Sequence, residues 1–260
     1  MKDYKSFAED LAYQAGAIMR KNFSLGMKKT LKKTDGSPVT VSDTAINKIV
    51  IQAVAKEFPT HSVMGEEESY KKESEYVWLC DPIDGTIPFS SGIPISTFSL
   101  ALVQNGAPVL GLIYDPFMDR LFVGEKGKGA FVNNKKILVS QNSLIKGQVL
   151  YVGWWQYSLY NFLSVRKELN SKGCKIMDFC SFAYAGALLA AGEFSAVIFG
   201  DRFPWDGAAV KVIVEEAGGK CTDLAGKEQR YDREINGFIA SNGNVHKELL
   251  AIVKQFAVKN

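Results

Sequence analysis

The sequence predicts an α/β fold in which layers of helices pack on β-sheets. After about residue 145, short apolar segments of β type alternate with helix-forming segments, which is typical of such layers. Of the 260 residues, 47% are hydrophobic and 23% are charged, a balance that excludes disordered, collagen-like and coiled-coil proteins. Because no Pro- or Ser-rich linker is present, we expect two halves, residues 1–145 and 146–260, that share a tight interface.

The first half is predicted to begin with two helices and continue as strands. Apolar residues recur at helical spacing over residues 4–18, and a Lys-, Gly- and Thr-rich stretch, 22–38, favours a flexible or hairpin-forming segment. A second helix is expected with Ser42 or Asp43 as its N-cap, ending at residues 58–59. The predicted strands that follow are 76–80, 97–103, 109–114, 120–124 and 130–132.

The clearest turn is Asn105-Gly106, a pair that favours a tight hairpin between the strands 97–103 and 109–114. In the second half the predicted elements alternate. They are a strand near 149, a helix from about 158, a strand at 175–177, a helix at 182–191, a strand at 196–199, a helix at 205–217, a strand at 237–240 and a last helix.

Charge and composition argue against several partners. Lys and Arg number 31 and Asp and Glu 28, so the net charge of +3 is too small to indicate nucleic acid or an acidic membrane surface. No apolar run reaches the roughly 20 residues of a membrane span, and the N-terminus has no signal-peptide core. The four cysteines, at 80, 174, 180 and 221, have no metal-binding spacing and are expected to be free thiols in a reducing cytoplasm.

Acidic residues gather where apolar segments end. Glu66 and Glu67 follow the segment 62–64, and Asp81 and Asp84 follow the strand 76–80. Pro82 forces an irregular turn, so two carboxylates three residues apart can point into one pocket. Buried like charges are costly unless a cation or a proton neutralises them. Carboxylate donors favour a hard ion such as Mg²⁺ over zinc.

Two further features adjoin these carboxylates. Gly85 and Thr86 offer backbone N–H groups and a hydroxyl, and a helix beginning there would make an anion-binding turn. Asp206 starts another predicted helix and can complete the site from the second half. Taken singly, each motif has a plainer interpretation: a solvated acidic loop, an Asx-turn with an N-cap, or a core tryptophan beside an N-cap. Only the combination favours metal-assisted phosphoryl transfer.

Taken in order, these motifs resemble the inositol monophosphatase family. They are Gly65-Glu66-Glu67, Asp81-Pro82-Ile83-Asp84-Gly85-Thr86, Trp205-Asp206-Gly207-Ala208-Ala209 and Glu216-Ala217-Gly218-Gly219. The resemblance extends from residue 39 to residue 243. It implies a sandwich of alternating helix and sheet layers and a Mg²⁺-dependent phosphomonoesterase that acts on a small phosphate ester. Many relatives are inhibited by lithium, and relatives are commonly homodimers.

The resemblance also implies the metal ligands. Glu66, Asp81 and the carbonyl of Ile83 would hold a first Mg²⁺ ion, and Asp81, Asp84 and Asp206 would hold a second. A metal ion of this kind neutralises phosphate charge, lowers the pKa of water and stabilises the leaving alkoxide. The C-terminal half would thereby close an active site whose other ligands come from the N-terminal half.

The remaining catalytic roles are assigned by the same resemblance. A third, looser ion would lie near Glu66, with Glu67 beside or sharing it. Gly85 and Thr86 would contact the phosphate, and Thr86 together with Asp43 would orient and deprotonate the attacking water. No covalent intermediate is required.

The sequence departs from the family where the substrate alcohol would bind. Family members usually carry Gly-Ser/Thr-Ala-Ala where this chain has Cys180 followed by Ser181, Phe182 and Ala183. Inositol phosphatases carry a carboxylate six residues before the tryptophan of the Trp-Asp motif, and this chain has Phe199 there. A phenyl ring cannot satisfy the hydroxyls of a polyol, so strict inositol specificity is not expected.

Neighbouring charges leave the substrate open. Arg202 can meet a second phosphate or can be a surface residue, and Asp201 can meet an amine. The alternatives are therefore a histidinol-phosphate phosphatase, a fructose-1,6-bisphosphatase or a 3′(2′),5′-bisphosphate nucleotidase. From a different class, a non-catalytic regulator remains. A basic run at Lys28, Lys29, Lys32 and Lys33 is interpreted as a segment over the active site that attracts phosphate.

Overall fold

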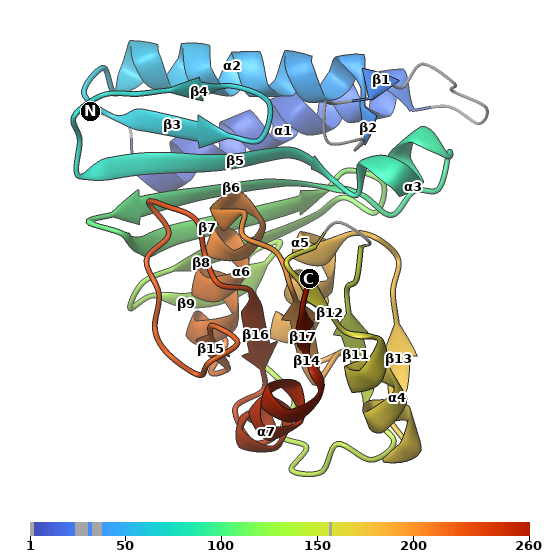
Figure 1. Cartoon of the computed structure of the whole chain (residues 1–260). Coiled ribbons are helices and arrows are strands. Elements are labelled where there is room, and N and C mark those ends of the chain that lie inside the picture. The colour runs from blue at the N-terminus through green and yellow to red at the C-terminus, as the bar shows by residue number, and fades with distance from the viewer. Residues whose placement is uncertain (1–2, 24–30, 33–37, 156–157) are drawn as a thin grey trace.

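The computed structural model describes residues 3–23, 31–32, 38–155 and 158–260, which form two main β-sheets covered by helices (Figure 1). The larger sheet consists of β3 (Ser62–Gly65), β4 (Ser69–Tyr70), β5 (Tyr76–Asp84), β6 (Thr97–Gln104), β7 (Ala107–Asp115), β8 (Arg120–Glu125), β9 (Gly129–Val132) and β10 (Lys135–Lys136). Its spatial order is β10-β9-β8-β7-β6-β5-β3-β4, with β3 and β5 parallel and the other neighbours antiparallel. Strand β6 is buried over nearly its whole length, as expected of a strand covered on both faces.

The smaller sheet comes from the second half of the chain. Its strands are β11 (Val149–Val152), β13 (Lys175–Met177), β14 (Ala196–Phe199), β15 (Lys220–Thr222) and β16 (Phe238–Ser241), in the order β13-β11-β14-β16-β15. Two short antiparallel pairs lie outside these sheets. They are β1 (Leu31–Lys32) with β2 (Pro38–Val39), and β12 (Tyr160–Asn161) with β17 (Val258–Lys259).

Helices alternate with the two sheets in layers. The described helices are α1 (Tyr4–Asn22), α2 (Val41–Glu57), α3 (Thr86–Ser90), α4 (Leu163–Ser171), α5 (Phe182–Ala190), α6 (Pro204–Glu216) and α7 (His246–Phe256). Helices α1 and α2 cover one face of the larger sheet, and α5 and α6 lie between the sheets (Figure 1). Helices α4 and α7 pack on the smaller sheet and on each other. The predicted layered α/β fold is confirmed.

Each interface between layers is filled by apolar side chains. Phe7, Leu11, Ile46 and Val50 of α1 and α2 pack with Trp78 of the larger sheet, and all five are buried. The layer formed by α5 and α6 belongs to a single cluster that includes residues of both sheets. The two halves therefore share this middle cluster, because the helices of the second half complete the face of the sheet built by the first.

Helix α6 lies unusually close to the larger sheet. A Cβ atom added to Gly111 on β7 would lie 2.6 Å from the backbone oxygen of Ala209, and one added to Gly124 on β8 would lie 2.7 Å from the Cα atom of Ile213. Only glycine permits this approach, since any side chain would push the helix away. The two glycines thus fix the position of α6, and Asp206 lies in its first turn.

Most predicted elements are present, with shifted boundaries. The N-cap of α2 is Thr40 and not Ser42 or Asp43, because Thr40 and Asp43 form a reciprocal capping box. The helix predicted from about residue 158 begins at Leu163, after residues 160–161 pair with β17. The predicted hairpin turn is confirmed, with φ of 51° at Asn105 and 85° at Gly106.

The cysteines and the helix lengths bear on two expectations from the sequence. All four cysteines are free thiols, with Cys180 exposed and the other three buried. Among the described residues, the helices are too short or too polar to traverse a lipid bilayer. Most of the segment 22–38 and three of the four lysines in its basic run, Lys28, Lys29 and Lys33, lie outside the described residues.

Candidate active site

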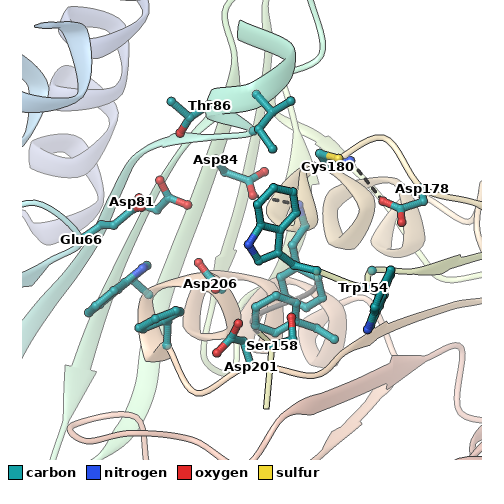
Figure 2. A pocket seen from close by; sticks show the side chains of 18 of the residues that line it. Glu66, Asp81, Asp84, Thr86, Trp154, Ser158, Asp178, Cys180, Asp201 and Asp206 are labelled. Atoms are coloured by element: carbon teal, nitrogen blue, oxygen red, sulfur yellow. Dashed lines mark hydrogen bonds between the residues drawn. The ribbon is translucent and has the colours of Figure 1, made fainter. Parts of the chain in front are cut away.

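A cavity of about 700 Å³ opens between the two halves of the molecule. The end of β5 and the turn after it form one side, and described residues within 151–155, 158–159 and 199–205 form most of the other (Figure 2). Glu66, Asp81 and Asp84 from the first half and Asp206 from the second line the same cavity. The structure therefore brings together carboxylates that are up to 140 residues apart in the sequence, which spacing alone could not establish.

The two aspartates of β5 are presented by a break in strand pairing. Asp81 pairs with Ser99 and Asp84 with Thr97, so the register against β6 shifts between them. This bulge is the form taken by the irregularity predicted at Pro82, but the strand continues through it to Asp84 instead of ending at residue 80. Both aspartate side chains are buried, as the sequence predicts for carboxylates at the inner end of a strand.

Asp81 lies at the centre of the negative charge. Burial raises the pKa of its carboxyl well above the ordinary value, and the charges of Glu66, Asp84 and Asp206 raise it further. Its buried Oδ1 atom has no hydrogen-bond partner among the described residues. A buried oxygen in this position requires either a proton or a cation.

These residues fit a hard divalent cation in donor type and charge. All the side-chain donors are carboxylates, which suit Mg²⁺ better than the softer transition metals. Within the described ranges, no group of three His, Cys, Asp or Glu side chains converges as a ready-made metal cage. The case for a bound cation therefore rests on Oδ1 of Asp81, which has no hydrogen-bond partner among the described residues, and on the repulsion between Asp81 and the neighbouring carboxylates.

Asp84 also contacts the start of α5, a role that the sequence did not predict. Its Oδ1 accepts a hydrogen bond from the backbone N–H of Phe182 at 2.8 Å, and its Oδ2 accepts one from the N–H of Tyr184 at 3.2 Å. The side chain of Asp84 thus satisfies the first turn of α5 from a different part of the chain. Burial raises the pKa of Asp84 to about 6, while hydrogen bonds from Ser181, from the backbone at 182–183 and from Thr97 lower it.

The position of Ser181 corrects the prediction that it binds substrate. Ser181 is fully buried, and its Oγ donates a short hydrogen bond to Oδ2 of Asp84. The hydroxyl of Thr97 donates to the same oxygen at 3.1 Å. Because Ser181 lies behind the carboxylate and has no exposed surface, it positions Asp84 and does not face a ligand.

A second constellation surrounds Thr86. Gly85 has a φ of 88° and is the N-cap of α3, so the predicted helix does begin at this turn. The hydroxyl of Thr86 donates to the carbonyl of Ile83 at 3.0 Å and lies 3.5 Å from Oδ1 of Asp43. The structure therefore brings Asp43 to Thr86, as the resemblance to the family implied.

Asp43 is buried and held in a fixed orientation. Its Oδ2 accepts hydrogen bonds from both the N–H and the hydroxyl of Thr40, which leaves Oδ1 to face Thr86. Burial raises the pKa of Asp43 to about 7; the Thr40 bonds lower it, and the charges of Glu66 and Glu67 raise it. Sequence reasoning missed Thr40, although the spacing Thr-x-x-Asp before an apolar run signals a capping box.

Aromatic side chains line much of the rest of the cavity. The aromatic wall consists of Trp154, Trp155, Phe182, Phe199, Phe203 and Trp205. The ring centroids of Phe182 and Phe199 are 4.4 Å apart, and those of Phe203 and Trp205 are stacked at 5.1 Å. Phe182 and Phe199 line the cavity, as predicted, whereas the pair at 154–155 was not singled out, despite being consecutive tryptophans.

The two charged residues predicted for substrate binding lie at the edge of the aromatic wall. Asp201 and Arg202 both line the cavity, and Oδ1 of Asp201 accepts a hydrogen bond from the N–H of Arg202 at 2.9 Å. The Nε of Arg202 lies 3.7 Å from a carboxylate oxygen of Glu234, and its guanidinium lies over the ring of Phe203. Arg202 is therefore an exposed, partly neutralised residue.

Buried carboxylates that repel one another and a hydroxyl near an aspartate of raised pKa, brought together in one cavity, fit a phosphoric monoester hydrolase. This chain belongs to the inositol monophosphatase family, whose model matches residues 1–257. Members of this family are phosphatases that generally depend on metal ions.

Individual relatives support the same assignment. A Thermotoga maritima fructose-1,6-bisphosphatase/inositol-1-monophosphatase is 35% identical over 217 residues, which cover 84% of this chain and 82% of that protein. A histidinol-phosphatase of Chlorobaculum parvum is 30% identical, with 95% of each chain covered. A solved structure of a Thermotoga maritima IMPase superposes with a TM-score of 0.88 at 31% identity, covering 98% of both chains.

Proposed function

We propose that this protein hydrolyses a small phosphate monoester by direct attack of water, with two or three Mg²⁺ ions as cofactors. The side chains of Glu66, Asp81, Asp84 and Asp206 and the carbonyl of Ile83 would hold the ions. The observation that carries the proposal is the buried Oδ1 of Asp81, which has no hydrogen-bond partner in the described part of the chain, among three further carboxylates that repel it. When bound at such a site, a divalent ion neutralises phosphate charge and makes water more acidic.

The residues around Thr86 would prepare the attacking water. The Thr86 hydroxyl would turn its single proton from the carbonyl of Ile83 toward Oδ1 of Asp43, 3.5 Å away. It would give that proton to Asp43 while taking one from the water, which leaves hydroxide to attack. A base with a pKa of about 7 suits proton transfer at neutral pH. Thr40 holds Asp43 through its other oxygen, so the proton-accepting atom keeps its direction.

The turn between β5 and α3 would hold the phosphate. The backbone N–H groups of Gly85 and Thr86 lie at the start of a helix, where they favour a negative charge. Glu67, half-buried beside Glu66, would help to hold a third ion. Proper alignment of water, phosphorus and leaving oxygen then accounts for most of the rate, because phosphoryl transfer needs mainly positioning and charge stabilisation.

The experiment is phosphate release from a panel of esters, measured with Mg²⁺ and with a chelator. The panel holds inositol 1-phosphate, histidinol phosphate, fructose 1,6-bisphosphate, adenosine 3′,5′-bisphosphate and glycerol 2-phosphate. We expect turnover that requires Mg²⁺ and that is abolished by Asp81→Asn. Absence of both turnover and Mg²⁺ binding by calorimetry would instead favour a non-catalytic regulator.

We further propose that the protein works in the cytoplasm as a homodimer, without a nucleic-acid or membrane partner. Its four free thiols support a reducing compartment. Light scattering of the purified protein tests the dimer, and a monomer at micromolar concentration would contradict it.

A further inference from the structure

We infer that the alcohol released by this enzyme carries a flat aromatic ring, which binds against the aromatic wall while the phosphate lies at the carboxylates. The inference rests on the proposed phosphatase function and adds the class of the leaving group. It concerns the side of the cavity away from Glu66 and Asp81, where the ester's organic part must extend (Figure 2).

The placement of the rings carries the inference. Trp154 and Trp155 follow strand β11, whereas Phe199 ends β14 and Phe203 and Trp205 begin the next helix. These separate segments present rings to one cavity. Trp155 keeps 39% of its surface exposed even though it is large and apolar. Exposed apolar surface lining a cavity is typical of a ligand site.

The charged groups beside the wall already have partners, among them Asp201, whose Oδ1 accepts a hydrogen bond from the N–H of Arg202 at 2.9 Å. The carboxylate of Asp178 already accepts hydrogen bonds from Arg166 at 2.9 Å and from the N–H of Cys180 at 3.3 Å. Arg202 lies beside Glu234, and the buried indole Nε1 of Trp154 is a single donor with no partner within the described ranges. Several ring hydroxyls would therefore lose water without gaining partners, which is costly.

An aromatic ring meets this wall with matching chemistry. Its faces can stack on, or meet edge-on, rings that are already arranged in close pairs, and such contacts add to the effect of burying apolar surface. A saturated ring of the same size buries similar area but lacks the π contact. The difference in affinity between an aromatic ligand and its saturated counterpart therefore measures the contribution of the π contact.

The test is binding of non-hydrolysable phosphonates to the full chain with Mg²⁺, measured by calorimetry. Benzylphosphonate and 2-phenylethylphosphonate are compared with their cyclohexyl counterparts and with methylphosphonate. We expect at least one aromatic ligand to bind about three- to tenfold more tightly than its saturated counterpart. If neither does, or if methylphosphonate binds equally well, the inference is overturned.

Substitutions at Trp155 test whether the aromatic preference arises at the aromatic wall. Trp155→Ala should remove most of the aromatic preference, whereas Trp155→Phe, which keeps a ring, should retain it. Tyr13→Ala is the matched control, because Tyr13 is an exposed aromatic residue on α1, across the larger sheet from the cavity. Loss of the preference in Tyr13→Ala, or its persistence in Trp155→Ala, would contradict the assignment to this wall.

Measuring hydrolysis and ligand binding on the same protein distinguishes this inference from the proposed function. Mg²⁺-dependent hydrolysis of glycerol 2-phosphate without any aromatic preference would support the phosphatase and overturn the inference. An aromatic preference in binding, with no ester hydrolysed, would support the wall's role and overturn the phosphatase.

Discussion

The two sides of the cavity differ in how they are built. The carboxylate side is held by regular structure: a bulge in β5 presents Asp81 and Asp84, and the first turn of α6 presents Asp206. The aromatic wall comes mainly from the ends of elements and the connections between them. Rigid elements suit groups that must meet within ångströms, whereas connecting segments can vary without disturbing the fold. We therefore expect the reaction type and the choice of substrate to depend on separable parts of the molecule.

Removing the carboxylate of Asp81 should cause the largest loss of activity. Asp81→Asn is expected to lower kcat/KM by about a thousandfold or more, since Asp81 would contact both proposed ions. Binding of benzylphosphonate to the aromatic wall should lose its Mg²⁺ dependence but keep its preference over cyclohexylmethylphosphonate. Kinetics on the best ester of the panel, with circular dichroism to show folding, checks this. Activity within tenfold of the wild type would reject the metal assignment.

Breaking the Thr86–Asp43 pair should remove proton transfer while leaving the ions in place. Thr86→Val and Asp43→Asn are each expected to lower kcat by about 10²- to 10⁴-fold, the range of general acid–base catalysis. Thr86→Ser keeps the hydroxyl and serves as the matched control.

The pH profile gives an independent readout of this pair. The pKa of Asp43 is raised to about 7, so the wild-type rate should rise with pH as Asp43 loses its proton. Bound Mg²⁺ opposes the negative charge of Glu66 and Glu67 and should move that limb to lower pH. In Asp43→Asn the limb should be absent, and a limb unchanged in this variant would exclude Asp43 as the base.

Mg²⁺ should stabilise the protein through the carboxylate side alone. At about 100 times its Kd, a ligand of the folded state adds about 2.7 kcal/mol, which corresponds to a rise in Tm of about 5–10 °C for a chain of this size. Asp81→Asn should lose this rise, and Trp155→Ala should keep it. Thermal unfolding with Mg²⁺ and with a chelator measures both, and an equal loss in the two variants would mean that the sides of the cavity are not separable.

Changing the wall should change the choice of substrate and not the chemistry. Phe199→Glu places a carboxylate at the position where inositol phosphatases carry one, six residues before Trp205. We expect the ratio of kcat/KM for inositol 1-phosphate to that for an aromatic ester to rise about tenfold. Phe199→Leu, which stays apolar, is the control. A uniform loss on all esters would point to damage of the neighbouring Phe182 and not to altered specificity.

The same contrast explains what the sequence could and could not predict. The layered fold, the hairpin at Asn105-Gly106 and the motif carboxylates follow from local patterns that tertiary packing preserves. The aromatic wall is assembled from residues far apart in the chain, and only Phe182, Phe199 and the tryptophan of the Trp-Asp motif drew attention. Ser181 was misassigned because a hydroxyl near a predicted pocket does not reveal which way it points.

Although Asp81 and Asp84 are only three residues apart, removing the charge of each should change the Tm of the metal-free protein in opposite directions. Burial raises the pKa of both carboxyl groups, so their ionised forms destabilise the folded state. The stability that the protonated forms contribute is fully present below the pKa of the unfolded state, 3.8. It is lost as the pH rises through the pKa of the folded state, which is about 6 for Asp84. Asp81→Asn relieves this cost and should raise the Tm of the metal-free protein at neutral pH. Asp84→Asn relieves it too, but an amide has a single acceptor oxygen for the four donors that the carboxylate serves, which are the N–H groups of Phe182 and Tyr184 and the hydroxyls of Ser181 and Thr97. Each buried donor left without a partner costs about 1–3 kcal/mol, so the summed cost exceeds the relief of charge.

We therefore expect the metal-free Tm to rise in Asp81→Asn and to fall in Asp84→Asn, by a few degrees in each case. Thermal unfolding at pH 7.5 and at pH 4.5 in a chelating buffer makes the measurement. The gain in Asp81→Asn should shrink at the lower pH, because the wild-type carboxyl is then already protonated. A rise in both variants would mean that charge relief outweighs the lost hydrogen bonds, and that Asp84 belongs to the ion site alone and not also to the start of α5.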